Sequence, residues 1–62
     1  MNLEELQAAI TATLAEIEQV KDRLEKTADV TEVRQLLRRK KELQYLQLWH
    51  LEQLEFYNNL WG

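Results

Sequence analysis

The sequence predicts an all-α protein, an antiparallel hairpin of two helices that associates into a four-helix-type bundle. The chain of 62 residues has one Gly, at its end, and no Pro, so it lacks the turn residues of a many-stranded β fold. Its apolar residues recur at spacings of three and four, as they do on one face of a helix. They make up 45% of the chain, which is more than a two-helix hairpin can bury alone.

The first helix is expected over about residues 3–26. Asn2 is a suitable N-cap, and Glu5 follows three residues later, at the position of the acidic partner in a capping box. The residues that follow form a narrow seam at alternating spacings of three and four: Leu3, Leu6, Ile10, Thr13, Ile17, Val20 and Leu24. Such a seam, with two positions per heptad, is typical of a helix that packs against another helix.

The break between the two helices is expected within residues 26–30. Asp29 can cap a second helix and Glu32 stands at the matching capping-box position, so the same pattern opens both helices. Thr27 is the alternative cap, and a single continuous helix is the alternative to a hairpin. Because no Gly ends the first helix, the turn has to rely on short polar side chains.

The second helix is expected over about residues 30–60, with apolar residues on two sides. One side is predicted to pack against the first helix and carries Val30, Val33, Leu37, Leu43, Leu46, His50, Leu54, Tyr57 and Trp61. The nearly opposite side carries Tyr45, Leu48, Trp49, Phe56 and Leu60. Because the first helix can cover only one side, the second side predicts a partner.

The length of the second helix also predicts an exposed end. Folded back on a shorter first helix, it must project beyond the start of that helix by several residues, which include two further aromatics, Tyr57 and Trp61. The predicted interface therefore consists of Tyr45, Leu48, Trp49, Phe56, Tyr57, Leu60 and Trp61. The simplest partner is a second copy of the chain, which gives a homodimer with two-fold symmetry, and a helix or tail of another protein is the other possibility.

A basic stripe precedes these aromatics on the second helix. Arg34, Arg38 and Lys41 share one helix face, which continues into Tyr45 and Trp49, and basic residues interleaved with aromatics suit contact with phosphate. The net charge is −3, however, and the stripe is short. We therefore favour pairing of these bases with acids of the first helix or of a second protomer.

Residues that could carry chemistry are sparse. The chain has no Cys and a single His, so the sequence predicts no metal site, no cofactor and no enzymatic activity. His50 is expected on the inward side, about level with Leu6, as a hydrogen-bonded core residue. Thr13 and Lys40 are expected to face each other and form a polar layer in the seam.

The function predicted for this single domain, residues 1–62, is that of a non-enzymatic interaction or assembly module. It would act as a small adaptor, regulator or docking domain, and the alternative is a small nucleic-acid-binding regulator that uses the basic stripe. In length and architecture the chain is similar to plasmid copy-number proteins of the helical-hairpin dimer kind and to the helical docking elements of modular synthases. No apolar run is long enough to span a membrane and no leader pattern is visible, so a cytoplasmic location is expected.

Overall fold

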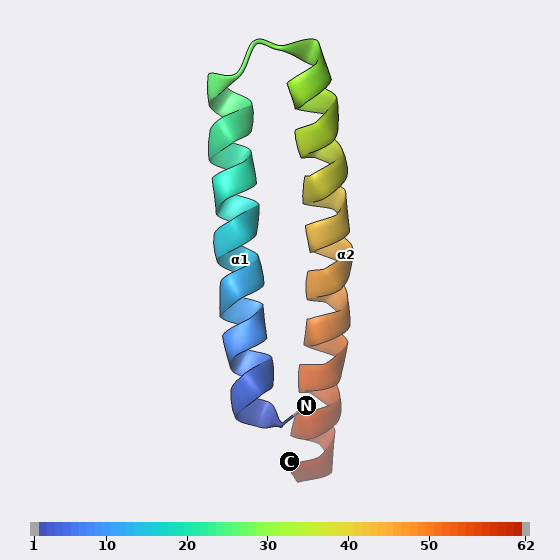
Figure 1. Cartoon of the computed structure of the whole chain (residues 1–62). Helices are drawn as coiled ribbons and strands as arrows, with labels where there is room; N and C mark the ends of the chain where they lie inside the picture. The colour runs from blue at the N-terminus through green and yellow to red at the C-terminus, as the bar shows by residue number, and fades with distance from the viewer. Residues whose placement is uncertain (1, 62) are drawn as a thin grey trace.

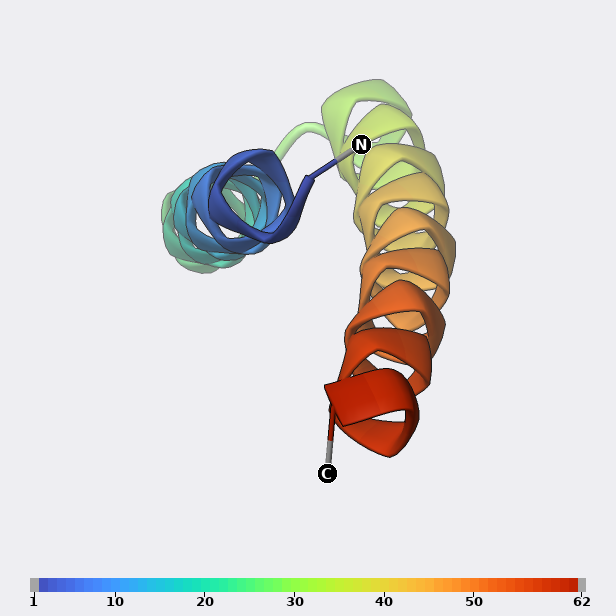
Figure 2. The same ribbon diagram turned by 90° about the horizontal axis from the view of Figure 1, so that it is seen from below.

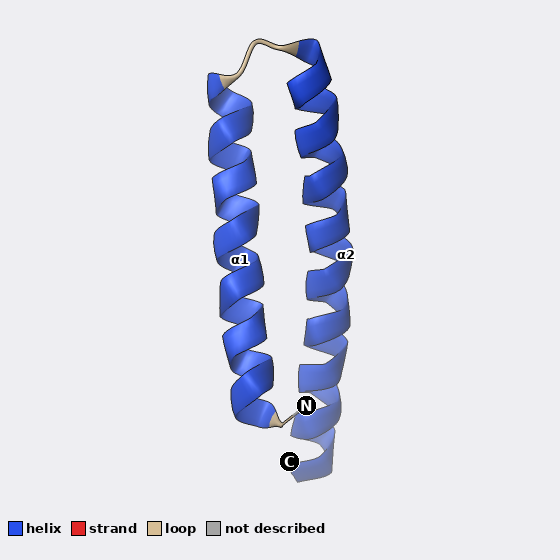
Figure 3. Cartoon of the chain, viewed as in Figure 1, coloured by secondary structure: helices blue, strands red, loops and turns tan. Residues whose placement is uncertain are grey.

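The chain forms two antiparallel helices in the computed structural model, which describes residues 2–61 (Figures 1 and 3). Helix α1 spans Leu3–Lys26 and helix α2 spans Val30–Trp61, so the predicted hairpin is confirmed, with α2 ending one residue later than expected. The helices pack side by side in a rod 47 Å long and 16 Å wide. Figures 1 and 2 show the C-terminal turns of α2 projecting beyond the start of α1.

Asn2 caps the start of α1, as the sequence predicts. Its side-chain Oδ1 accepts a hydrogen bond from the Glu5 N–H at 2.8 Å, and its carbonyl accepts one from the Leu6 N–H at 2.9 Å. Charges at the two ends of α1 complement the helix dipole, because Glu4 and Glu5 lie in the first turn and Arg23 and Lys26 in the last. The helix is therefore well terminated without help from tertiary contacts.

Side-chain oxygens shape the turn of Thr27, Ala28 and Asp29. The Asp29 carboxylate accepts a hydrogen bond from the Thr31 N–H at 3.0 Å and so caps α2, while Thr27 Oγ1 accepts one from the Asp29 N–H at 3.3 Å. Glu32, predicted to complete the capping box, instead pairs with Arg23 of α1. No described residue has a positive φ angle, so this turn needs no glycine.

The core is a narrow seam between the helices. The buried side chains among the described residues are Leu6, Thr13 and Ile17 from α1 and Leu43 and His50 from α2, of which Leu6 and Leu43 are fully buried. On α2 most of the half-buried and buried positions follow spacings of three and four, with Glu32 and Gln53 half-buried beside them: Val33, Leu36, Lys40, Leu43, Gln47, His50, Leu54 and Tyr57. The seam thus has the heptad geometry of two packed helices, with several polar members.

Three residues predicted to face α1 lie elsewhere. Val30, Leu37 and Leu46 are 65%, 51% and 45% exposed, and the seam uses Leu36 and Gln47 instead. The prediction selected these residues for their apolar character, although they break the spacing of three and four residues along the seam. In the structure the spacing prevails, because two packed helices stay in contact only along positions three and four residues apart.

A polar link sets the register of the hairpin. The Gln47 Nε2 group donates a hydrogen bond to the Ile10 carbonyl at 3.0 Å, and the Gln47 Oε1 atom lies 3.0 Å from Nδ1 of His50. Since that oxygen can only accept, Nδ1 of His50 is the donor. His50 is 4% exposed, so the prediction of an inward, hydrogen-bonded histidine is confirmed.

The alignment of the two helices also shows that the predicted polar layer of Thr13 and Lys40 is wrong. Ile10 is level with Gln47, and Glu16 is level with Arg39, to which it is bonded at 2.9 Å. Thr13 lies between these two levels and is therefore opposite Leu43 rather than Lys40. Thr13 is buried, as expected, but Lys40 lies closer to the turn than the prediction placed it.

We predict that replacing the cap of α2 weakens the whole hairpin. Asp29→Ala should lower the free energy of unfolding by about 1 kcal/mol, because the Thr31 N–H loses its acceptor at the start of α2. Denaturant unfolding followed by circular dichroism, at fixed protein concentration, measures the change. Glu25→Ala, at an exposed position of α1, is the matched control and should change stability by less than about 0.5 kcal/mol. Equal losses in both variants would contradict the assignment of Asp29 as the cap.

Candidate interaction surface

The predicted interface residues lie largely in solvent. Tyr45 and Phe56 are each 62% exposed and Trp49 is 47% exposed, and Leu48 and Leu60 are also more than half exposed. Tyr57 is half-buried at the seam, and its ring meets that of Phe56 edge-on at 6.3 Å between centroids. Trp61 ends α2, and its side chain lies outside the described part of the chain.

Further apolar side chains of α2 are exposed beside these. They were missed as interface candidates because they were assigned to the seam or left unassigned: Val30, Leu37, Leu46 and Leu51. Exposed large apolar residues thus outnumber buried ones along α2, and α1 covers only a narrow stripe of this helix. Exposed apolar side chains therefore occur along most of the length of α2.

An exposed side of α2, which extends from the flank of its contact with α1 (Leu37 and Leu48) to the edge away from α1 (Tyr45), carries a distinct order of side chains, and we call it the outer face. Its members follow from the rotation of about 100° per residue and are all exposed: Arg34, Leu37, Arg38, Lys41, Tyr45, Leu48, Glu52, Glu55 and Phe56. Bases occupy the half nearest the turn, Tyr45 and Leu48 the middle, and acids the far half. The outer face is therefore apolar at its centre and oppositely charged on either side.

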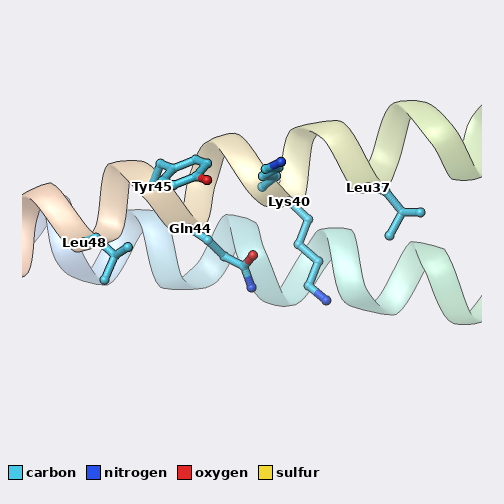
Figure 4. A pocket seen from close by; sticks show the side chains of 6 residues that line it. Leu37, Lys40, Gln44, Tyr45 and Leu48 are labelled. Carbon is cyan, nitrogen blue, oxygen red and sulfur yellow. The ribbon is translucent and has the colours of Figure 1, made fainter.

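Two hollows run along the edge of the outer face. The first, of 440 Å³, is lined by Leu37, Lys40, Lys41, Gln44, Tyr45 and Leu48. Figure 4 shows Leu37, Gln44 and Leu48 pointing to the side on which α1 lies, while Tyr45 lies over the opposite edge of α2. Because α2 alone supplies the lining, this hollow is an open surface depression that suits a side chain of a partner.

The second hollow, of 390 Å³, continues the first toward the end of α2. It shares Gln44 and Leu48 with the first hollow and adds Gln47 and Leu51, and its floor includes Ile17 of α1. The apolar edge of α2 is therefore grooved from Leu37 to Leu51. Packing of an apolar helix needs such alternating ridges and hollows.

Of the bases among residues 34–41 of α2, only Arg39 pairs with an acid of α1. Arg39 bonds Glu16 at 2.9 Å and also lies 3.5 Å from Glu42 of its own helix. Within residues 2–61, Arg34, Arg38 and Lys41 are exposed and have no carboxylate at ion-pair distance. These three bases therefore do not pair with acids of α1, and the other predicted pairing, with acids of a second protomer, stays a prediction.

Glu52 and Glu55, at the C-terminal end of the outer face, are the acidic counterparts of these unpaired bases. Both are exposed, and neither forms an ion pair with another described residue. The sequence reading did not single them out, although the absence of any base among residues 42–61 was the signal that could have done so. The outer face thus presents uncompensated charges of both signs.

Arg23 and Glu32 form a second ion pair between the helices, next to the turn. The hydrogen bond from Arg23 lowers the pKa of the Glu32 carboxyl below its ordinary value, and the same bond to Glu32 raises the pKa of Arg23. Thr27 contributes, as the smallest of the causes, to the lowered pKa of Glu32. This pair and the Arg39–Glu16 pair tie α1 to α2 and leave the outer face untouched.

Known proteins offer no guide to this surface. No family model matches the chain, and no curated protein or solved structure shows significant similarity to it. Over the residues described, no group of three or more His, Cys, Asp or Glu side chains could hold a metal ion. Neither α1 nor α2, over the same residues, has the length and apolarity needed to cross a membrane.

We predict a pH-dependent contribution from Glu32. Because the folded-state pKa of Glu32 is lowered, its ion pair stabilises the hairpin above the ordinary carboxyl pKa and loses this effect as pH falls through the folded-state value. Glu32→Gln should therefore melt below the wild type at pH 7, and the difference should vanish near about pH 2.

Thermal unfolding by circular dichroism at both pH values measures this difference. Glu25→Gln removes an exposed carboxylate that has no ion pair among the described residues, and it should show no such change with pH. A Glu32→Gln difference that persisted unchanged in acid would contradict the role of its charge.

Proposed function

We propose that the chain is a non-enzymatic interaction module that forms a homodimer through the exposed side of α2, which comprises the outer face and the adjacent Trp49. The observation that carries this proposal is the imbalance of burial within one hairpin. Of the described apolar side chains only Leu6, Ile17 and Leu43 are buried, whereas Trp49 and Phe56 remain largely in solvent. A second layer of helices over α2 would correct this imbalance.

The free energies expected for burial of these side chains support self-association. Covering the exposed half of one aromatic side chain contributes about 2–3 kcal/mol, at about 25 cal/mol per Å² of apolar area. Several such side chains from each of two copies together match or exceed the association cost of about 4–15 kcal/mol. A core as small as that of one hairpin rarely supplies more than about 3–5 kcal/mol. The gross gain from covering these side chains in a dimer is therefore larger than the contribution expected from the core of a single hairpin.

The environment of His50 supports a non-enzymatic role. This residue is buried, its Nδ1 group is bonded to the Gln47 amide, and its ring lies against that of Trp49 at 5.6 Å between centroids. A catalytic histidine needs access to substrate and commonly a carboxylate that orients it. The bonding of His50 suits a residue that fixes the helix register. The module would act as an adaptor, regulator or docking domain.

Nucleic-acid binding is the second candidate, because Arg34, Arg38 and Lys41 are exposed and carry no carboxylate partner among the described residues. Glu52 and Glu55 on the same face and the net charge of −3 oppose it. We expect no gel retardation of mixed RNA or duplex DNA at micromolar protein and low salt. Retardation that weakened with added salt would favour nucleic acid as the partner.

We predict that charges placed among the exposed aromatics dissociate the dimer. The wild type should sediment at about twice its chain mass of 7.5 kDa, and the Trp49→Glu, Phe56→Glu double variant at about the chain mass. Each new carboxylate would have to be buried in the interface without a partner. Sedimentation velocity measures the mass, and circular dichroism shows whether the variant remains helical.

The matched control places the same two charges on the outer side of α1. Ala8→Glu, Ala15→Glu alters two exposed positions one heptad repeat apart and should keep the wild-type mass. An unchanged mass for the aromatic double variant, with unchanged helicity, would show that these residues are not an interface.

A further inference from the structure

We propose that the two copies pair α2 against α2 in antiparallel orientation, so that the bases of one outer face meet the acids of the other. This inference rests on the proposed self-association and adds its orientation and its register. The occupant of the outer face is a second copy of this chain, and the charge pattern along that face is what identifies it.

The charges decide the orientation. Arg38 and Lys41 lie toward the turn, Glu52 and Glu55 lie toward the C-terminal end, and none of the four forms an ion pair with another described residue. A parallel pair of α2 helices would place bases against bases and acids against acids, and like charges across an interface oppose association. An antiparallel pair places each base beside an acid of the second copy.

One register pairs both acids of the outer face with bases and leaves Arg34 level with Asn59 of the second copy. When Lys41 is level with Glu52 of the second copy, Arg38 is level with Glu55, Tyr45 with Leu48, and Leu37 with Phe56. These pairs lie symmetrically about the middle of the outer face, as facing positions do in an antiparallel coiled coil. Two-fold symmetry repeats every pair on the other side of the axis. The apolar Tyr45–Leu48 pairs therefore lie at the centre, the charged pairs flank them, and the Leu37–Phe56 pairs lie near the charged pairs.

Neighbouring registers fail this test. A shift of one heptad toward the turn places Lys41 against Tyr45 and Arg38 against Leu48, and a shift the other way places Leu48 against Glu52. Each shift sets charged side chains against apolar ones, although the first also brings Arg34 level with Glu52, and burial of an unpaired charge opposes association. The proposed register is therefore separated from its neighbours by charge as well as by shape.

The proposed register also accounts for the overhang of α2. Its two-fold axis passes between Leu46 and Gln47, close to the middle of the helix spanning Val30–Trp61, so the two α2 helices overlap along nearly their full length. The C-terminal turns, which project beyond the start of α1, then lie beside the first turns of the second α2 (Figure 1). The two α2 helices form the centre of the assembly and the two α1 helices lie outside.

Charge reversal tests the pairing. Lys41→Glu and Glu52→Lys should each weaken the dimer by about tenfold or more, because each places like charges together twice in the interface. The double variant, and also an equimolar mixture of the two single variants, should recover association. Lys26→Glu, on the exposed side of α1, is the control and should leave the dissociation constant unchanged. Failure of the double variant to recover, with helicity retained, would overturn the register.

Thiol cross-linking tests the orientation separately, since the chain has no cysteine of its own. Tyr45→Cys, next to the two-fold axis, should form a disulfide-linked dimer on its own. Lys41→Cys and Glu52→Cys should form one only when the two variants are mixed. Linkage of Lys41→Cys alone in a dimeric protein would overturn the antiparallel orientation and leave the proposed function standing. A wild type that sedimented as a monomer throughout would overturn both.

Discussion

The narrow width of a helix–helix contact is the constraint from which the other features of this chain follow. One helix covers a single stripe of its neighbour, and α1 with 24 residues is also shorter than α2 with 32. α2 carries apolar side chains around much of its circumference, so most of them lie outside the stripe. The exposed aromatics, the grooved edge and the projecting end of α2 are consequences of this mismatch between the two helices.

Polar and apolar residues are distributed in an unusual way across the two sides of α2. The seam contains Thr13, Gln47 and His50, whose hydrogen-bonding groups align the helices, whereas Trp49 and Phe56 lie outside it. Polar seam positions lower stability but define register and partner. The interior of the hairpin is thus specific and only weakly stabilising, and the larger apolar surface is available for contacts beyond the chain.

Features that depend on neighbouring residues in the chain could be predicted from the sequence, whereas features that depend on contacts between the two helices could not. The Asn2 and Asp29 caps depend on neighbouring residues, so both helix starts and the inward position of His50 could be predicted. Glu32 was misassigned because its partner Arg23 is on the other helix. Leu37 was misassigned because apolar character was weighted above spacing, and Leu36 lies in the seam instead. The exposure of Tyr45, Leu48 and Phe56 followed from helical rotation, but the absence of intrachain partners for the charges of the outer face depends on the register.

The turn between the helices is relevant to the stability of the closed hairpin relative to an open conformation of the chain. Thr27 and Asp29 reverse the chain direction with ordinary backbone angles, and neither Gly nor Pro separates the two helices. Thr27 is extended at the end of α1, but no residue type in the turn excludes a helix, so a straight rod in which α1 runs on into α2 is the conformation with which the hairpin competes. In such a rod α1 would seek the α2 of another molecule, which is the geometry of domain exchange. The side-chain hydrogen bonds of the turn therefore separate intramolecular packing from intermolecular exchange.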